Sequence, residues 1–208
     1  MKRALLIAVS LCLAFAGWST VCAEDGFYVI PVTKANYAPV AKTGQTVSQG
    51  AGDDGALQKG VAWPNPRFTD NGNGTVTDKL TGLIWLKNAN AFGLRTWDQA
   101  RTDIATVADG NHGLTDGSKA GDWRLPNVKE LQSLVNYGFY GPALPNTLGT
   151  GQWSEGDPFQ GVQSDFYWSS TTNAGSTTTA WGVYFNAGSV VNNAKSNTIY
   201  VWCVRGGR

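Results

Sequence analysis

The stretch from Gly121 to Leu134, Gly-Asp-Trp-Arg-Leu-Pro-Asn-Val-Lys-Glu-Leu-Gln-Ser-Leu, constrains the fold of this chain more than any other. Pro126 suits a first helical position, because its φ is already helical and its missing N–H would have no partner there. Apolar residues recur at helical spacing over residues 128–135, and Gly138 follows as a stop signal. Strand-like sequence lies on both sides of this stretch. The pattern therefore predicts an amphipathic helix between two groups of strands, with Trp123, Leu125 and Leu131 in the core.

Turn signals divide the rest of the chain into short elements. Residues 67–78 predict a hairpin around an Asn/Gly turn, and residues 75–86 predict a second one. Thr96 and Gln99 have the spacing of a capping box, which predicts an earlier helix that ends at Gly110. Further strands are predicted at 166–171, at 180–185 with 190–191 as a hairpin, and at 199–205. The expected fold class is α+β, with two helices, short antiparallel sheets and long loops.

The N-terminus has the order of a secretory signal peptide. Lys2 and Arg3 precede an apolar run over residues 4–17, and the small-x-small pattern Val21-Cys22-Ala23 follows. We expect cleavage after Ala23 and a secreted, periplasmic or cell-surface protein. No later apolar run is long enough for a transmembrane helix, which needs about 20 residues. The predicted organisation is a signal peptide at 1–23, an N-terminal extension or arm at 24–63, and a domain at 64–208.

Charge and cysteine content exclude several classes of protein. Without Lys2 and Arg3, the 16 basic residues fall to 14 against 15 acidic ones, a net charge of −1. This balance has no basic surplus to indicate nucleic acid or anionic lipid as a partner. Cys12 and Cys22 leave with the signal peptide, so Cys203 has no intrachain partner for a disulfide. We expect Cys203 to be a buried apolar residue.

The sequence contains no arrangement of residues typical of an enzyme or a metal centre. His112 is the single histidine, so a multi-histidine site is impossible, and no G-x-S-x-G motif is present. The carboxylates show no pairing that indicates glycosidase chemistry. Asp70-Asn71-Gly72-Asn73-Gly74 gathers oxygen ligands, but position 12 of an EF-hand counted from Asp70 would be Thr81. We predict a hairpin turn there, with Ca²⁺ as an alternative, and otherwise no catalytic residue, metal ligand or cofactor.

Aromatic and amide side chains in the C-terminal third indicate binding. Aromatic planes can cover the apolar faces of sugars, and Asn amides can both donate to and accept from hydroxyl groups. Strand alternation places Trp181 and Val183 on one face and Tyr184 on the other, so about half of these aromatics belong to the core. The candidate ligand-binding residues are Trp168, Trp181, Tyr184, Asn186, Asn192 and Asn193.

An ordered series of motifs resembles a known family. The series consists of Phe68–Asp78, Thr81–Trp85, Thr96–Ala100, Asp122–Asn127 with Glu130-Leu131, Tyr167–Thr171 and Val201–Gly207. It spans roughly residues 64–207 and resembles the Lcl C-terminal domain family of bacterial proteins. The resemblance implies a fold related to C-type lectins and formylglycine-generating enzymes. The named member of the family is the trimeric, sulfated-glycan-binding domain of a collagen-like adhesin.

The chain also departs from its relatives. Ile104 stands where many of them carry a Cys that could pair with the Cys of the closing strand, and no collagen-like Gly-x-y tract is present. We expect a non-catalytic, secreted or envelope-associated module that recognises glycans or other cell-surface ligands. The alternative is a structural or protein–protein interaction module of the bacterial envelope, which could act as a homo-oligomer.

Overall fold

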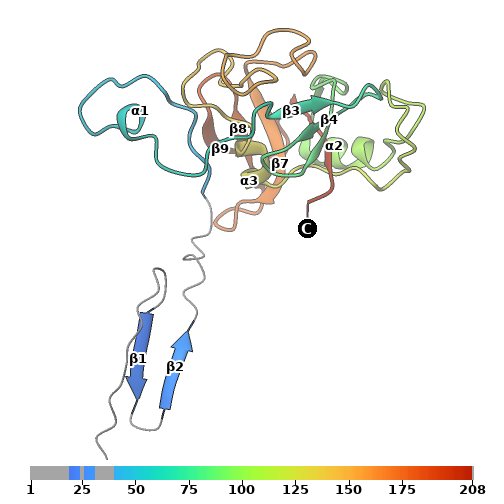
Figure 1. Ribbon diagram of the computed structural model, residues 1–208. Helices are drawn as coiled ribbons and strands as arrows, with labels where there is room; N and C mark the ends of the chain where they lie inside the picture. Colours follow the sequence, from blue (N-terminus) through green and yellow to red (C-terminus); the bar gives the residue numbers. More distant parts are fainter. Residues whose placement is uncertain (1–18, 24–25, 31–39, 208) are drawn as a thin grey trace, which may run out of the picture. The chain divides into compact units, whose positions relative to one another are not determined.

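The computed structural model describes residues 19–23, 26–30 and 40–207, and the chain divides into two compact units, Met1–Pro39 and Val40–Arg208 (Figure 1). In the first unit, strand β1 (Ser19–Ala23) pairs antiparallel with β2 (Gly26–Ile30). The predicted signal peptide lies outside the described residues except for the five residues of β1. Among the described residues, no helix combines the length and the apolar character needed to cross a bilayer.

The second unit contains a four-stranded antiparallel sheet in the order β11-β5-β4-β3. Its strands are β3 (Phe68–Asp70), β4 (Thr75–Asp78), β5 (Ile84–Leu86) and β11 (Val204–Arg205). The two predicted hairpins are therefore confirmed. Gly72 and Gly74 adopt positive φ values of 72° and 83° in the first turn, a conformation that glycine adopts without a steric penalty.

The other sheet of this unit has five strands in the order β6-β10-β7-β8-β9. Its strands are β6 (Leu94–Arg95), β7 (Phe166–Thr172), β8 (Thr179–Tyr184), β9 (Ser189–Ala194) and β10 (Ile199–Tyr200). All neighbours are antiparallel except β10 and β7, which run parallel. The predicted β8–β9 hairpin is confirmed, and β9 is longer than the two residues expected.

The closing strand predicted at 199–205 is wrong as a single element. Its first two residues form β10 in the five-stranded sheet, and its last two form β11 in the four-stranded sheet. Residues 201–203 cross between the sheets and are completely buried. The indole Nε1 of Trp202 donates to the Leu86 carbonyl (2.7 Å), and the Leu86 N–H donates to the Cys203 carbonyl (3.2 Å). All three residues are buried, without the alternation of a strand exposed on one face, because both sheets contact this segment.

Helix α2 (Trp97–Ile104) begins with the predicted capping box between Thr96 and Gln99. The helix ends before the predicted stop at Gly110. After Ile104 the backbone tightens into turns, in which the Val107 N–H donates to the Ile104 carbonyl (3.0 Å). Val107 continues the helical spacing of the apolar residues Trp97, Ala100 and Ile104, and it is fully buried although it lies beyond the helix.

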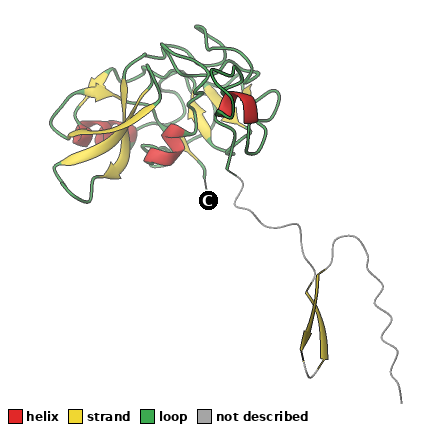
Figure 2. Cartoon of the chain, turned by 90° about the vertical axis from the view of Figure 1, so that its left-hand side faces the viewer, coloured by secondary structure: helices red, strands yellow, loops and turns green. Residues whose placement is uncertain are grey.

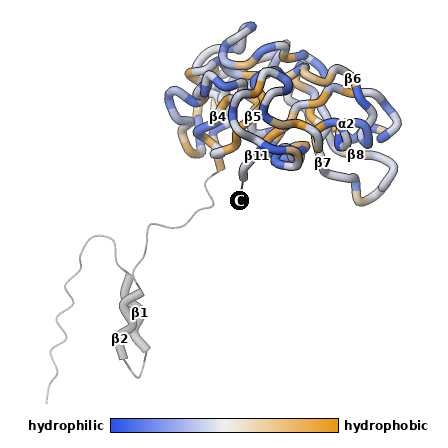
Figure 3. The backbone as a smooth tube through the Cα atoms, turned by 90° about the vertical axis from the view of Figure 1, so that its right-hand side faces the viewer, coloured by the Kyte–Doolittle hydropathy of each residue, from blue (hydrophilic) through white to orange (hydrophobic). Residues whose placement is uncertain are grey.

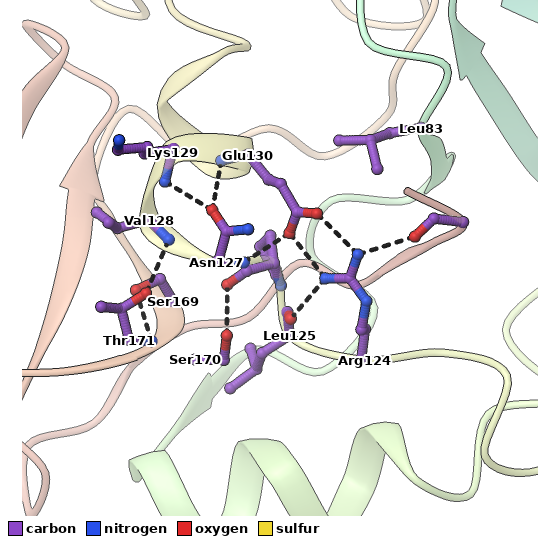
Figure 4. Close-up of polar contacts among 12 residues, drawn as sticks. Leu83, Arg124, Leu125, Asn127, Val128, Lys129, Glu130, Ser169, Ser170 and Thr171 are labelled. Atoms are coloured by element: carbon purple, nitrogen blue, oxygen red, sulfur yellow. Dashed lines mark hydrogen bonds and ion pairs between the residues drawn. The ribbon is translucent and has the colours of Figure 1, made fainter. Parts of the chain in front are cut away.

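Helix α3 (Val128–Gln132) lies in the stretch that constrains the fold, but its limits differ from the prediction. Asn127 is the N-cap, so Pro126 precedes the helix instead of occupying its first turn. Glu130 completes a capping box with Asn127 and also pairs with Arg124 at 2.7 and 2.8 Å, as Figure 4 shows. Beyond Gln132 the chain continues in turns, in which Leu134 and Val135 are buried in the core.

Loops and turns connect these elements over most of the unit (Figure 2), and helix α1 (Asp54–Leu57) lies in one of them. Strand β5, with the sequence Ile-Trp-Leu, lies in a hydrophobic part of the tube, whereas many of the loops are hydrophilic (Figure 3). Trp123, Leu125 and Leu131 are 2%, 4% and 0% exposed, which confirms their predicted place in the core. Cys203 is buried and unpaired, as predicted. The unit is thus a mixed α/β structure with two sheets and few helical residues.

Candidate functional site

The structure places Trp168, the first candidate ligand-binding residue, in the core. Its side chain is 0% exposed, and its Nε1 donates to the Arg95 carbonyl at 2.9 Å. This bond joins β7 to β6, two strands that are not neighbours in the sheet. Trp168 therefore supports the sheet and is not available to a ligand on the surface.

The other five candidates do not form a single site. Trp181 lies opposite Asn192 on β8 and β9, whereas Tyr184 is on the opposite face and stacks on Phe166 with ring centroids 4.4 Å apart. Asn193 is opposite Ala180 and so faces the other way from Asn192. The remaining candidate, Asn186, follows β8, and its amide donates to the Ser164 hydroxyl at 3.1 Å. Trp181 with Asn192 is the only cross-strand aromatic–amide pair among these five.

A larger candidate site is a pocket of about 470 Å³ between the segment before β3 and the turns after α3. Its lining is mostly polar and aromatic. The lining residues are Lys42, Gly44, Gln45, Thr46, Val47, Gln49, Ala62, Trp63, Asn136, Tyr137, Gly138, Phe139, Gly149 and Thr150. This volume is within the range typical of small-ligand sites.

Residues 40–63, here called the N-terminal loop, close on themselves (Figure 1). Eight of these residues form one wall of the pocket. The Lys42 N–H donates to the Val61 carbonyl (3.0 Å), and the Val61 N–H donates to the Val40 carbonyl (2.8 Å). Inside the loop, the Asp53 carboxylate accepts from the N–H groups of Gln49 (2.6 Å) and Ala56 (2.8 Å). These bonds lower the pKa of Asp53 and cap α1.

The N-terminal loop contacts the rest of the unit through closely packed backbone. The Tyr137 N–H donates to the Thr43 carbonyl at 3.0 Å. Gly44 has a φ of +89° and packs against Asn136 so closely that a Cβ atom would overlap the Asn136 amide. A Cβ atom on Gly138 would lie 2.9 Å from the Gly44 carbonyl oxygen. The two glycines therefore permit the close approach of the two walls.

Trp63 has a fixed orientation at the edge of the pocket. Its Nε1 donates to the Lys42 carbonyl (2.9 Å), and the Arg67 guanidinium lies 4.2 Å from its ring centroid. Arg67 is fully buried and is itself held by Asp78 (3.1 Å) and by the Ser133 carbonyl (2.5 Å). A cation over an aromatic ring is an attractive contact, so Arg67 helps to fix the orientation of the indole.

Tyr137 provides a second oriented ring. Its hydroxyl donates to the Gly188 carbonyl (3.3 Å) and accepts from the Gln132 amide (3.0 Å), while 45% of the residue remains exposed. Among the lining residues, Lys42 alone carries a charge at neutral pH. The amides of Gln45 and Gln49 add donors and acceptors. The pocket thus offers apolar ring surfaces beside neutral hydrogen-bonding groups.

In the turn considered for Ca²⁺, both carboxylate oxygens of Asp70 bind other groups of the protein. Asp70 Oδ1 accepts from the Gly72 N–H (3.0 Å), and Oδ2 pairs with the Lys87 ammonium (2.6 Å). The Asn71 amide donates to the hydroxyl groups of Thr75 and Thr77. Among the residues that the structure describes, no group of three or more His, Cys, Asp or Glu side chains is placed to hold a metal ion.

His112 lies beside this turn in a smaller pocket of about 230 Å³, together with Lys87, Asn88 and Gln160. Its ring centroid is 4.7 Å from that of Phe92. Glu130, one of the carboxylates considered for acid–base chemistry, accepts hydrogen bonds from Arg124 and from the Asn127 N–H.

Sequence reasoning missed the contribution of the N-terminal loop. Residues 42–59 contain few large apolar side chains, a composition that predicts an extended arm or a long loop laid over the domain, and no binding residue was predicted in it. Trp63 was a usable signal, because a large aromatic residue directly after a polar, glycine-rich segment needs a surface to contact. The hydrogen-bond acceptor of Trp63, the Lys42 carbonyl, is 21 residues away in the sequence, however, and no local pattern identifies it.

Comparison with known families identifies residues 74–205. This region, more than half of the chain, matches the family described as the Lcl C-terminal domain. The chain therefore belongs to the Lcl C-terminal domain family. No curated protein matches it in sequence.

Proposed function

We propose that this member of the Lcl C-terminal domain family is a non-catalytic binding module that recognises glycans in the pocket beside the N-terminal loop. The observation that carries the proposal is the presence of two oriented aromatic side chains, Trp63 and Tyr137, in one pocket with neutral amides and hydroxyls. Sugars pair apolar C–H faces with hydroxyl rims, and this lining complements both. Oriented side chains also reduce the entropy lost on binding.

The pocket favours an uncharged oligosaccharide segment. No carboxylate lines it, and Lys42 contributes a single positive charge. A sugar ring lying on Trp63 would have Gln45 and Gln49 available to its hydroxyl groups. The volume of about 470 Å³ suits a short segment rather than a long chain.

The test compares two tryptophans in the two candidate surfaces. Wild-type protein is screened on a glycan array and titrated calorimetrically with chitotriose, cellotriose and maltotriose. Trp63→Ala should weaken binding about tenfold or more, which corresponds to about 1.4 kcal/mol or more. Trp181→Ala, on the β8–β9 surface, should change affinity less than about twofold. Near-UV circular dichroism of both variants checks that the fold is retained.

Two results would contradict this proposal. The first is a folded wild-type protein that binds no glycan on the array and none of the three trisaccharides. The second is a reversed order of effects, in which Trp181→Ala abolishes binding and Trp63→Ala does not. The second result would move the site to the Trp181–Asn192 pair expected from the sequence.

We further propose that the fold is related to C-type lectins and that the protein is exported. Two sheets, few helical residues and long loops support the first statement, and the order of the first 23 residues supports the second. An experimental structure compared with lectin folds tests the first. N-terminal sequencing of the protein from its native envelope or medium should begin at Glu24 and tests the second.

A protein-binding module is the second candidate function, because the N-terminal loop exposes several aliphatic side chains. Val47 and Leu57 are 65% and 53% exposed. Exposed apolar groups gathered on one segment are typical of contact surfaces. Light scattering and pull-down from envelope extract discriminate between the candidates: a defined partner or oligomer without glycan affinity favours this one.

A further inference from the structure

We propose that the N-terminal loop is the specificity-determining wall of the glycan pocket, so that the pocket exists only while this loop is docked. This inference rests on the proposed function, and it identifies the part of the pocket that determines which glycan binds. Eight of the fourteen lining residues belong to the loop, and all eight lie outside the family-matched residues 74–205. The matched region alone therefore supplies less than half of the site.

The chemistry of the two walls differs. The turns after α3 contribute Tyr137, Phe139, backbone at Gly138 and the Asn136 amide, which is 1% exposed and already accepts from the Gly138 N–H. The N-terminal loop contributes Trp63 and most of the long polar side chains, including Gln45 and Gln49. A wall made of rings and backbone offers surface to many ligands, whereas amide groups discriminate between hydroxyl arrangements. Specificity should therefore follow the loop.

The loop is built as a unit that can move as a whole. The backbone bonds between Lys42 and Val61 close its ends, and the Asp53 carboxylate organises its interior. Its attachment to the turns after α3 includes the Thr43–Tyr137 hydrogen bond and the packing of Gly44 against Asn136. Such a unit can open by breaking a few contacts without unfolding the core.

Ligand binding and loop docking must then be coupled. A ligand that contacts both walls binds the docked state more tightly than the open one, and so it shifts the equilibrium toward docking. At a ligand concentration of about ten times the Kd, opening is suppressed about tenfold. The Tyr137 amide reports this equilibrium directly, because its hydrogen-bond acceptor is on the loop.

The experiment uses two glycine variants of the full chain. Gly44→Ala places a methyl group against Asn136 at a residue with φ +89°. Gly52→Ala is the matched control, since Gly52 has φ +83° in the same loop but no atom within 4 Å of the place that a methyl group would occupy. Both variants carry similar backbone strain, and only Gly44→Ala obstructs docking.

Hydrogen exchange at the Tyr137 amide and calorimetric titration with the trisaccharides are measured for each protein. Gly44→Ala should speed exchange and weaken binding, each about tenfold or more, relative to Gly52→Ala. In wild type, the bound trisaccharide at about ten times its Kd should slow exchange at Tyr137 about tenfold. Gln49→Ala should weaken binding about threefold without altering exchange, while Gln160→Ala, in the smaller pocket, should change neither.

Equal affinities of Gly44→Ala and Gly52→Ala, with exchange at Tyr137 unaffected by sugar, would overturn this inference and leave the proposed function intact. A wild-type protein that binds no trisaccharide would overturn the proposed function and the inference with it. If Gly44→Ala fails to fold, Gln49→Ala against Gln160→Ala decides the matter, and equal binding by these two overturns the inference.

Discussion

At the scale of single residues, buried charge shapes the region behind the pocket. Arg67 and Asp78 are both completely buried and pair at 3.1 Å, and Asp78 also accepts from the Leu80 N–H (2.9 Å) and the Thr81 hydroxyl (3.0 Å). A buried ion pair is tolerated where further hydrogen bonds satisfy it. Here Arg67 also orients Trp63. Asp78 and the Ser133 carbonyl hold the guanidinium beside this ring, and Arg67 Nη1 has no hydrogen-bond partner among the described residues.

Glu130 gives the fold a measurable dependence on pH. Burial alone would raise the pKa of this carboxyl, but hydrogen bonds from Arg124 and from the Asn127 N–H together outweigh burial and lower it. A carboxyl with a lowered pKa stabilises the folded state when it is ionised. Its contribution is complete above the ordinary value of about 4.5 and is lost as the pH falls through the folded-state value.

Glu130→Gln should therefore destabilise the protein by about 1–2 kcal/mol at pH 7, since it removes a charge-assisted pair and weakens the capping box. The difference from wild type should shrink as the pH falls below about 4.5. Urea unfolding at about pH 7, 5 and 3 measures it. A difference that stays constant over this range would show that ionisation of Glu130 does not contribute.

At the scale of elements, local signals located the hairpins and the start of helix α2. The capping box at Thr96 is a short-range pattern, and the Asn and Gly residues before β4 favour the turn that they form. The start of α3 was misplaced, because Asn127 and not the residue before Pro126 caps that helix. The helix ends were less predictable. Helices α2 and α3 end at Ile104 and Gln132, and no glycine marks either end. The apolar residues that follow each helix are buried in turns, so their spacing did not show where the helix stops.

The centre of strand β8 has a position where only glycine fits. A Cβ atom on Gly182 would lie 2.5 Å from the Tyr167 carbonyl oxygen. Gly182→Ala should separate β7 from β8 and lower the free energy of unfolding by about 1–3 kcal/mol. Thermal denaturation measures the effect. Gly175→Ala is the control, because its Cβ would meet only the Asn173 side chain, at 3.6 Å; equal melting temperatures for the two variants would show that the close approach at Gly182 does not matter.

At the scale of the whole molecule, residues 201–203 join the two sheets. The Trp202 ring lies 5.5 Å from Trp85 and 4.8 Å from Phe159, measured between centroids, and its Nε1 donates to the Leu86 carbonyl. Tyr167 of the five-stranded sheet lies 5.7 Å from the same ring. Trp202 thus contacts residues of both sheets and of the long loop before β7.

Trp202→Ala should cost about 3–5 kcal/mol, because it leaves a cavity where the sheets meet. Both sheets should lose stability together, which amide hydrogen exchange in β4 and β8 can measure. The control is Trp181→Ala, which truncates a partly exposed ring of the same type. Loss of protection in β8 with β4 unchanged would show that the sheets are not coupled through Trp202.

The sequence alone determined the class of fold, most strand positions, the start of helix α2, the buried Trp123, Leu125 and Leu131, and the family. These features depend on short-range spacing, turn chemistry and ordered motifs, which a chain carries without its tertiary contacts. The tertiary structure decided that the closing strand divides between two sheets, that Trp168 is buried, and that the N-terminal loop forms a wall of a pocket. Each of these depends on contacts between residues far apart in sequence, such as Trp202 with Leu86 and Tyr137 with Thr43.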